Sequence, residues 1–233
     1  MKRGFTLVEV LVAMAILVVV LAVGVRYFAS TSELARNTQA RSELQDRVRM
    51  VMQVVTADLQ MAGARYWNSG NQNQAFSLPL PPLSGSNMGP KDTLTLYYVT
   101  SLRDLASACR RVDYGFEGDT LRRSDVNATP SSGSDCTTPP PNSQPLAEGM
   151  LALDIQYQCS DGSRKDTPDC GTDAPPRPAL VTVSGCSLTS VANPTPASLT
   201  TVTGKTLACP QGRACYALTQ EVLMPNLKPL PTP

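Results

Sequence analysis

The sequence predicts an α+β fold, in which one long N-terminal helix packs on an antiparallel β-sheet head with long, disulfide-stapled loops. Three observations support this prediction. Residues 5–25 form a long apolar run in which Glu9 is the one charged residue, the stretch that follows keeps helical periodicity without proline, and all 7 cysteines fall after Leu105 among proline-rich segments. The 233 residues suffice for one ordinary domain with an extended element, but not for two enzyme-sized domains.

Composition divides the chain into four segments. Residues 1–4 read as a short basic leader, residues 5–25 as the transmembrane half of the helix, residues 26–63 as its amphipathic half, and residues 64–233 as an exported β-rich head. The head is close to neutral, and binding to nucleic acid usually needs a basic excess on one domain. We therefore do not expect nucleic acid to be a partner.

The apolar run from Phe5 to Val25 is long enough to cross a membrane. As a helix it extends about 32 Å at about 1.5 Å per residue, close to a hydrocarbon core of about 30 Å. A secretory signal peptide has a shorter apolar run followed by a small-residue cleavage site, whereas here the plausible processing site precedes the run. Lys2 and Arg3 favour a cytoplasmic N-terminus, so that everything after Arg26 lies outside the cytoplasm.

Helical character continues beyond Arg26. Proline does not occur before Pro79, and glycine does not occur between Gly24 and Gly63. Apolar residues recur at spacings of three and four, the pattern of a helix with one buried face. They are Leu44, Val48, Val51, Met52, Val55, Leu59 and Ala62. We therefore predict a single helix over Thr6–Ala62, ended by Gly63, which tolerates the left-handed conformation of a helix stop.

Short alternating or β-branched runs replace the helical pattern in the remainder of the chain. The predicted strands are Thr93–Val99, Val112–Phe116, Thr120–Arg123, Leu151–Tyr157, Ala179–Val183 and Tyr216–Met224. A turn around Gly118 joins the second and third as a hairpin. The connections 68–91, 124–148, 160–178 and 185–213 are rich in Pro, Ser, Thr, Asn and Gly and are predicted to be surface loops.

The cysteines indicate disulfides formed outside the cytoplasm. They are Cys109, Cys136, Cys159, Cys170, Cys186, Cys209 and Cys215. The short spans from Cys159 to Cys170 and from Cys209 to Cys215 close easily within a loop. Cys109 and Cys136 are candidates for a third bridge, but spacing leaves open which of the three remaining cysteines is the odd thiol.

The composition argues against an enzyme and against a bound metal or cofactor. Histidine is absent, which excludes Ser-His-Asp and Cys-His nucleophile systems and histidine metal ligands. Zinc is disfavoured because there is also no C-x-x-C pair. A calcium site is conceivable among neighbouring aspartates, yet they lack D-x-D-x-D spacing and are better explained as solvated loop charges. They are Asp154, Asp161, Asp166, Asp169 and Asp173.

The segment Gly4-Phe5-Thr6-Leu7-Val8-Glu9 resembles the class III signal of the type IV pilin superfamily. Gly4 offers an unhindered backbone to a protease at the membrane edge. The resemblance implies that prepilin peptidase cleaves between Gly4 and Phe5 and that the new Phe5 amine is methylated.

Glu9 is unusual because a carboxylate near the centre of a membrane helix is unfavourable by roughly 2.5 to 3.5 kcal/mol. It lies one helical turn from Phe5, near the amine that cleavage creates, and the amine of a neighbouring subunit could pair with it in a filament. The resemblance to pilins implies that Glu9 recruits and registers incoming subunits. The alternative is a glutamate near the interface that reaches the lipid headgroups and has no function.

The helix end Asp58-Leu-Gln-Met-Ala-Gly63 resembles the D-L-x-x-A-G segment of PilW-type minor pilins and of J-type pseudopilins of type II secretion. The resemblance does not cover residues 160–214. It implies a structural minor pilin that primes or caps a type IV pilus with other minor pilins and the major pilin on an inner-membrane assembly platform. It also implies a single-pass inner-membrane location before the subunit reaches the filament tip. The alternatives are a J-like minor pseudopilin and a tip module for adhesion or DNA uptake.

Overall fold

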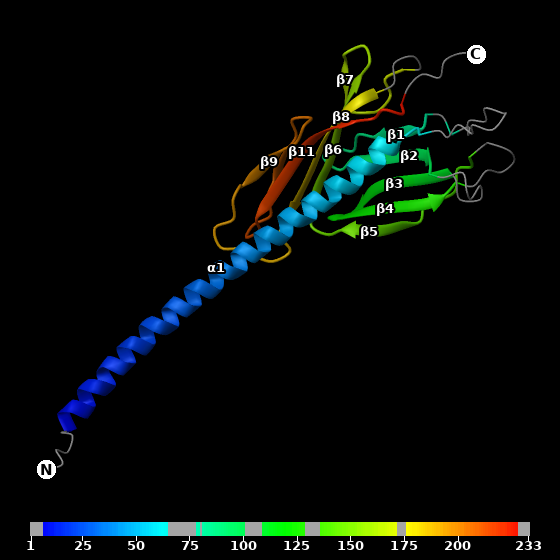
Figure 1. Cartoon of the computed structure of the whole chain (residues 1–233). Helices are drawn as coiled ribbons and strands as arrows, with labels where there is room; N and C mark the ends of the chain where they lie inside the picture. The colour runs from blue at the N-terminus through cyan, green and yellow to red at the C-terminus, as the bar shows by residue number, and fades with distance from the viewer. Residues whose placement is uncertain are drawn as a thin grey trace, which may run out of the picture.

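A single helix, α1 (Leu7–Met61), projects far beyond the head at one end and packs on it at the other (Figure 1). The computed structural model describes residues 7–64, 78–79, 81–100, 109–128, 136–171 and 176–227. The predicted helix over Thr6–Ala62 is confirmed within this range, and Thr6 itself lies outside the described residues. At about 1.5 Å per residue, the 55 residues of α1 extend about 82 Å.

Strands β1 to β5 form the first sheet, in the order β1-β2-β3-β4-β5, with every neighbouring pair antiparallel. Their bounds are Leu83–Ser86 for β1, Thr93–Val99 for β2, Cys109–Glu117 for β3, Thr120–Asn127 for β4 and Ser143–Ala147 for β5. The hairpin turn between β3 and β4 contains Gly118 with a φ of 60°, the positive φ expected of it.

A second sheet has the order β11-β8-β6-β7, and β9 pairs with β10 as a separate hairpin. The bounds are Met150–Cys159 for β6, Arg164–Lys165 for β7, Pro176–Cys186 for β8, Ser198–Thr200 for β9, Thr206–Ala208 for β10 and Cys215–Leu223 for β11. A parallel bridge between Lys91 and Leu153 joins the first sheet to β6. The two sheets flank the C-terminal half of α1 (Figure 1).

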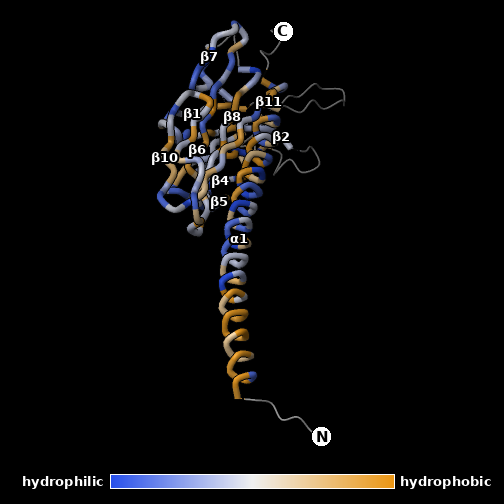
Figure 2. The backbone as a smooth tube through the Cα atoms, turned by 90° about the vertical axis from the view of Figure 1, so that its left-hand side faces the viewer, coloured by the Kyte–Doolittle hydropathy of each residue, from blue (hydrophilic) through white to orange (hydrophobic). Residues whose placement is uncertain are grey.

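The C-terminal half of α1 supplies one wall of the core. Its buried apolar side chains are Ala40 and six members of the predicted stripe, Leu44, Val48, Val51, Met52, Val55 and Leu59, and Asp58 is buried among them. They pack with inward-facing residues of both sheets, among them Leu94, Leu121, Ile155 and Val183. The N-terminal part of α1 is mostly hydrophobic and lies clear of the head (Figure 2).

Five predicted strands lie within observed ones, and the sixth, Tyr216–Met224, matches β11 except for its last residue, but the predicted loops are partly wrong. Five further short strands, β1, β5, β7, β9 and β10, fall in segments predicted to be surface loops. These strands have few β-branched residues, and each is held by pairing with a distant or adjacent segment, which local sequence does not reveal. The antiparallel head is confirmed, as two bridged sheets and a hairpin.

All seven cysteines lie in the described residues. Three disulfides connect Cys109 with Cys136, Cys159 with Cys170, and Cys209 with Cys215. Cys186 is the free thiol and is buried. The first bridge ties β3 to the loop ahead of β5, and the other two close short loops.

Candidate functional site

The exposed N-terminal half of α1 is the candidate functional surface. Its large apolar side chains from Leu7 to Val25 are between 46% and 77% exposed. The helix contains an 18-residue window of mean hydropathy 2.9 in which no residue is buried. An apolar surface of this size is stable in water only when lipid or other helices cover it.

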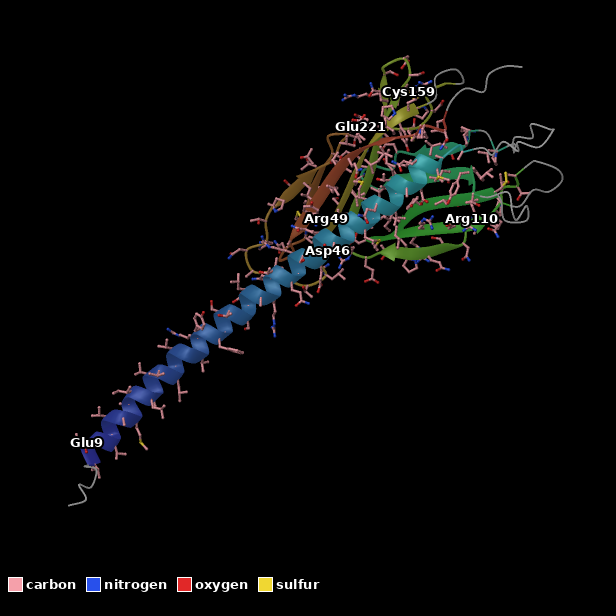
Figure 3. All side chains as sticks on the ribbon, viewed as in Figure 1. Glu9, Asp46, Arg49, Arg110, Cys159 and Glu221 are labelled. Carbon is pink, nitrogen blue, oxygen red and sulfur yellow. A yellow bond between two sulfur atoms is a disulfide. The ribbon has the colours of Figure 1, made fainter. Side chains whose placement is uncertain are left out.

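Glu9 is the acidic residue in the first turn of α1, at the end farthest from the head (Figure 3). A carboxylate is favoured at this end because the helix dipole is positive at its N-terminus. Gly4 and Phe5, the predicted cleavage and methylation positions, lie outside the described residues. The structure therefore places Glu9 in the first turn of the helix, as predicted. The Phe5 amine with which we expect it to pair belongs to a residue outside the described range.

Loops of the head form hydrogen bonds with α1 just beyond its exposed half. Asn37 Oδ1 accepts a hydrogen bond from the Ala192 backbone N–H at 3.1 Å, and an Arg41 guanidinium nitrogen donates to the Asn193 carbonyl at 3.2 Å. Further along the helix, Arg47 Nη1 lies within 3.4 Å of the carbonyl oxygens of Glu148 and Cys186. Polar side chains thus fix to the helix the rim of the head that lies nearest the exposed half of α1.

A buried ion pair fixes the other end of the packed helix. Asp58 Oδ2 and Oδ1 accept hydrogen bonds from Arg123 Nε and Nη2 of β4 at 2.9 and 3.1 Å. Asp58 also accepts a hydrogen bond from the Tyr114 hydroxyl of β3. Burial raises the pKa of Tyr114, and the charge of Asp58 raises it further. A bidentate pair of this kind fixes geometry as well as charge.

The helix terminus is joined to the first sheet through the backbone. Gly63 has a φ of 75°, and its N–H donates to the Tyr97 carbonyl of β2 at 2.9 Å. The Val99 N–H donates to the Ala64 carbonyl at 3.0 Å, so the chain beyond the helix runs along the edge of β2. Asn226 Nδ2 caps the Gln60 carbonyl at 2.8 Å. These contacts complete the C-terminal anchor of α1.

A second polar cluster lies where the two sheets meet. Asp154 of β6 is fully buried and accepts hydrogen bonds from the Thr203 hydroxyl and N–H and from Lys205 Nζ at 3.1 Å. Nearby, Asp92 Oδ2 accepts the Ile155 N–H at 2.9 Å. Burial raises the pKa of Asp92 to about 6, against the opposing effect of the Ile155 hydrogen bond. The cluster holds the β9–β10 hairpin on the outer face of β6.

Asp154 is not one of a group of solvated loop aspartates, so that interpretation is wrong for this residue. Asp161, Asp166 and Asp169 do lie in or beside the loops around β7, and Asp173 lies outside the described residues. Hydrogen bonds from the Ser163 hydroxyl and N–H lower the pKa of exposed Asp161. Among the described residues, no three Cys, Asp or Glu side chains come together as a metal-ligating group.

A hollow of about 280 Å³ lies beside β4 and β5. Its walls include Arg123, Asp125, Asn142 and Gln144. Both charged groups are already paired with each other at 3.0 Å, and Arg123 is also bound to Asp58. The hollow therefore offers a ligand no uncommitted charge.

Sequence reasoning missed the two polar clusters. Asp58 was noted only for its place in a helix-end segment, and Asp92, Tyr114 and Lys205 were not noted. A carboxylate on the otherwise apolar buried face of the helix was the one available signal for Asp58, because such a group needs a partner. For Asp92 and Lys205 no signal existed, since their partners are far away in the sequence.

Comparison with known proteins agrees with this geometry. Residues 1–25 match the family model of the prokaryotic N-terminal methylation motif. The chain is 97% identical over 233 residues to pilin-like protein PilA3 of Thermus thermophilus, covering 100% of both chains. A solved type IV-like pilin from Thermus thermophilus matches with a TM-score of 0.53 at 15% identity, over 79% of this chain and 97% of that one. A structure of two type II secretion pseudopilins of Vibrio vulnificus matches with a TM-score of 0.45 at 9% identity, over 81% and 95%.

Proposed function

This chain belongs to the type IV pilin family as a pilin-like structural protein and not an enzyme, and from that premise we propose that it is a minor pilin. In this role it joins other minor pilins to prime or cap a type IV pilus of which the major pilin forms the shaft. It would act as a PilW-type subunit on the inner-membrane assembly platform and end at the filament tip.

The observation that carries the proposal is the exposed apolar half of α1 with Glu9 in its first turn. This half-helix is about 30 Å long, matches a bilayer, and can leave lipid only by packing against similar helices of other subunits. Glu9 lies one turn after the proposed cleavage site, where the methylated amine of a neighbouring Phe5 can neutralise it. That pairing compensates a charge cost that lipid would otherwise impose.

The head supports a tip position over a place in the shaft. Long loops cover it, three disulfides tie them, and the helix enters it only from Asn37 onward. Bulk of this kind is tolerated best at the end of a filament, where fewer neighbours crowd the head. In this proposal the chain has four segments: a leader (1–4), a transmembrane half-helix (5–25), a packed half-helix (26–63) and an exported head (64–233).

Removal of the charge at position 9 tests the proposal. We expect Glu9→Ala to be cleaved and inserted into the membrane normally but to be lost from sheared filaments, measured by immunoblot of the filament and membrane fractions. Glu33→Ala is the matched control, because Glu33 is an exposed acid on α1 beyond the apolar run. Incorporation of Glu9→Ala at the level of the control would contradict the pairing role.

Processing is tested separately at Gly4. A bulky side chain ahead of the scissile bond blocks the peptidase, so Gly4→Leu is expected to accumulate as an unprocessed precursor of slower mobility. Mass spectrometry of the wild-type N-terminus is expected to find methylated Phe5. A mature chain that still begins at Met1 would refute the whole assignment of residues 1–4 as a leader.

A further inference from the structure

The free thiol of Cys186 lies directly opposite a disulfide. In the antiparallel pair of β8 and β11, Cys186 is in register with Cys215, which is bonded to Cys209. The Cys186 N–H donates to the Gly149 carbonyl at 2.7 Å, on the side of β8 away from β11. Cys186 and Cys215 are therefore a non-hydrogen-bonded pair, the kind in which opposite side chains approach most closely.

The spacing of such a pair suits a disulfide. Non-hydrogen-bonded partners have Cα atoms about 4.5 Å apart, inside the range of about 4.4 to 6.8 Å over which cysteines are bridged. Both side chains point to the same face of the sheet, since they are in register. The register of β8 and β11 therefore places Cys186 and Cys215 as partners suited to a disulfide.

The surroundings of Cys186 favour reaction with this neighbour over reaction with solvent. Cys186 is 1% exposed and Cys215 is 6% exposed, so external oxidants do not reach the thiol in the folded head. Arg213 Nη1 lies 4.0 Å from the Cys186 sulfur. A guanidinium at this position offsets the negative charge that an attacking sulfur carries.

We propose that Cys186, Cys209 and Cys215 form an internal thiol–disulfide exchange switch, in which Cys186 replaces Cys209 as the partner of Cys215. The Cys186 sulfur, as thiolate, attacks the Cys215 sulfur. A Cys186–Cys215 bond forms as the Cys209–Cys215 bond breaks, and Cys209 leaves as a thiolate that takes up the proton Cys186 released. No external oxidant or reductant is needed, because the protein keeps one disulfide and one thiol.

The exchange changes the rim of the head that lies nearest the exposed half of α1. The 209–215 loop holds the neighbouring segment through the bond from the Val191 N–H to the Gly212 carbonyl at 2.8 Å. That segment in turn grips α1 through Ala192 and Asn193. Exchange opens the loop and loosens this grip, and it converts a buried thiol into a half-buried one at Cys209.

Alkylation mapping tests the switch on the full-length chain in detergent. The protein is incubated with N-ethylmaleimide at pH 8 without reductant and digested with trypsin, which cleaves after Lys205 and Arg213 and so separates the three cysteines. Label at Cys209, with the peptide that carries Cys215 linked by a disulfide to the peptide that carries Cys186, is the expected result. Cys186→Ala removes the attacking sulfur, and the labelled share of Cys209 is expected to fall at least tenfold.

Cys186→Ser is a second variant with the same expectation, should the alanine substitution disturb the fold. Two outcomes overturn the proposal. One is label at Cys186 with the Cys209–Cys215 bond intact, since this shows that the Cys186 thiol reacts with the reagent and does not exchange with the disulfide. The other is no label at Cys209 in the wild-type protein, since this shows that Cys209 stays bonded to Cys215.

Discussion

Asp92 is expected to destabilise the folded head as pH rises, the opposite of an acid that is stabilised by an ion pair. It ends the segment that bridges the two sheets, and its Oδ2 accepts the Ile155 N–H at 2.9 Å. Its Oδ1 is buried without a hydrogen-bond partner among the described residues. Burial, assisted by the charge of Asp154, raises the pKa of Asp92 from 3.8 to about 6. The perturbation we consider is Asp92→Asn.

The sign follows from proton binding. Between pH 4 and 6 the folded state holds a proton on Asp92 that the unfolded state has lost, so this group lowers the free energy of unfolding as pH rises through that window. Above pH 6 Asp92 is ionised in both states, and the free energy of unfolding stays lowered by the full cost of burying its charge. The raised pKa of about 6 converts to at most about 3 kcal/mol, and relaxation around the charge leaves on the order of 1 to 2 kcal/mol.

Asparagine keeps an acceptor for the Ile155 N–H and removes the charge. We therefore expect Asp92→Asn to raise the free energy of unfolding by about 1 to 2 kcal/mol at pH 7.5 and to leave it unchanged at pH 4. Urea unfolding of the full-length protein in detergent, followed by far-UV circular dichroism at both pH values, measures the difference.

The matched control is Asp161→Asn. Hydrogen bonds from Ser163 lower the pKa of this exposed acid, so its amide variant is expected to gain no stability at pH 7.5. Two results would contradict this prediction: a loss of stability in Asp92→Asn at pH 7.5, and an equal change at the two pH values. Either result would show that the ionised carboxylate of Asp92 does not destabilise the folded head.

Three substitutions probe the remaining contacts by urea unfolding. Asp58→Ala leaves the partly buried Arg123 guanidinium without its acceptor and is expected to lower the free energy of unfolding by about 3 kcal/mol. The double variant Asp58→Ala, Arg123→Ala is expected to regain part of this loss, because no unpaired charge is left. Gly63→Ala places a Cβ at a φ of 75° and is expected to cost about 1 to 2 kcal/mol, whereas no loss would show that the helix stop adapts. Lys205→Met strands the buried charge of Asp154 and is expected to cost about 2 kcal/mol; an unchanged midpoint would mean that Thr203 alone satisfies it.

The helix and its buried face could be predicted because both depend on local periodicity. Leu44, Val48 and Leu59 recur at the helical period whatever they pack on, so the sequence alone identified the stripe. Strands with clear alternation, such as Thr93–Val99, were identified for the same reason. The short strands were missed because β1 and β5 take their conformation from the neighbours with which they pair.

The misreading of Asp154 shows where local rules fail. Alternation along Leu151–Tyr157 puts Asp154 on the face of β6 away from the core, which the sequence suggests is solvated. In the folded chain the β9–β10 hairpin covers that face, and Lys205 supplies a cation from 51 residues away. The pairing of Asp58 with Arg123 spans 65 residues in the same way. Such partners are fixed by topology, which no local pattern specifies.

The polar contacts of α1 fix the position of the helix along the sheets more than they add to the strength of its packing. An apolar stripe of similar side chains tolerates a slip by one helical turn, because one leucine or valine replaces another against the sheets. Asp58 and Gly63 at one end, and Asn37 and Arg47 at the other, each accept a single position. At about 1.5 Å per residue, the first of these contacts, at Asn37, lies about 42 Å from Glu9 along the helix axis, and the contact at Asp58 lies about 74 Å from it. If a filament registers its subunits through Glu9, the same contacts decide where each head lies on its surface, and a change at Asp58 would act at a distance on assembly.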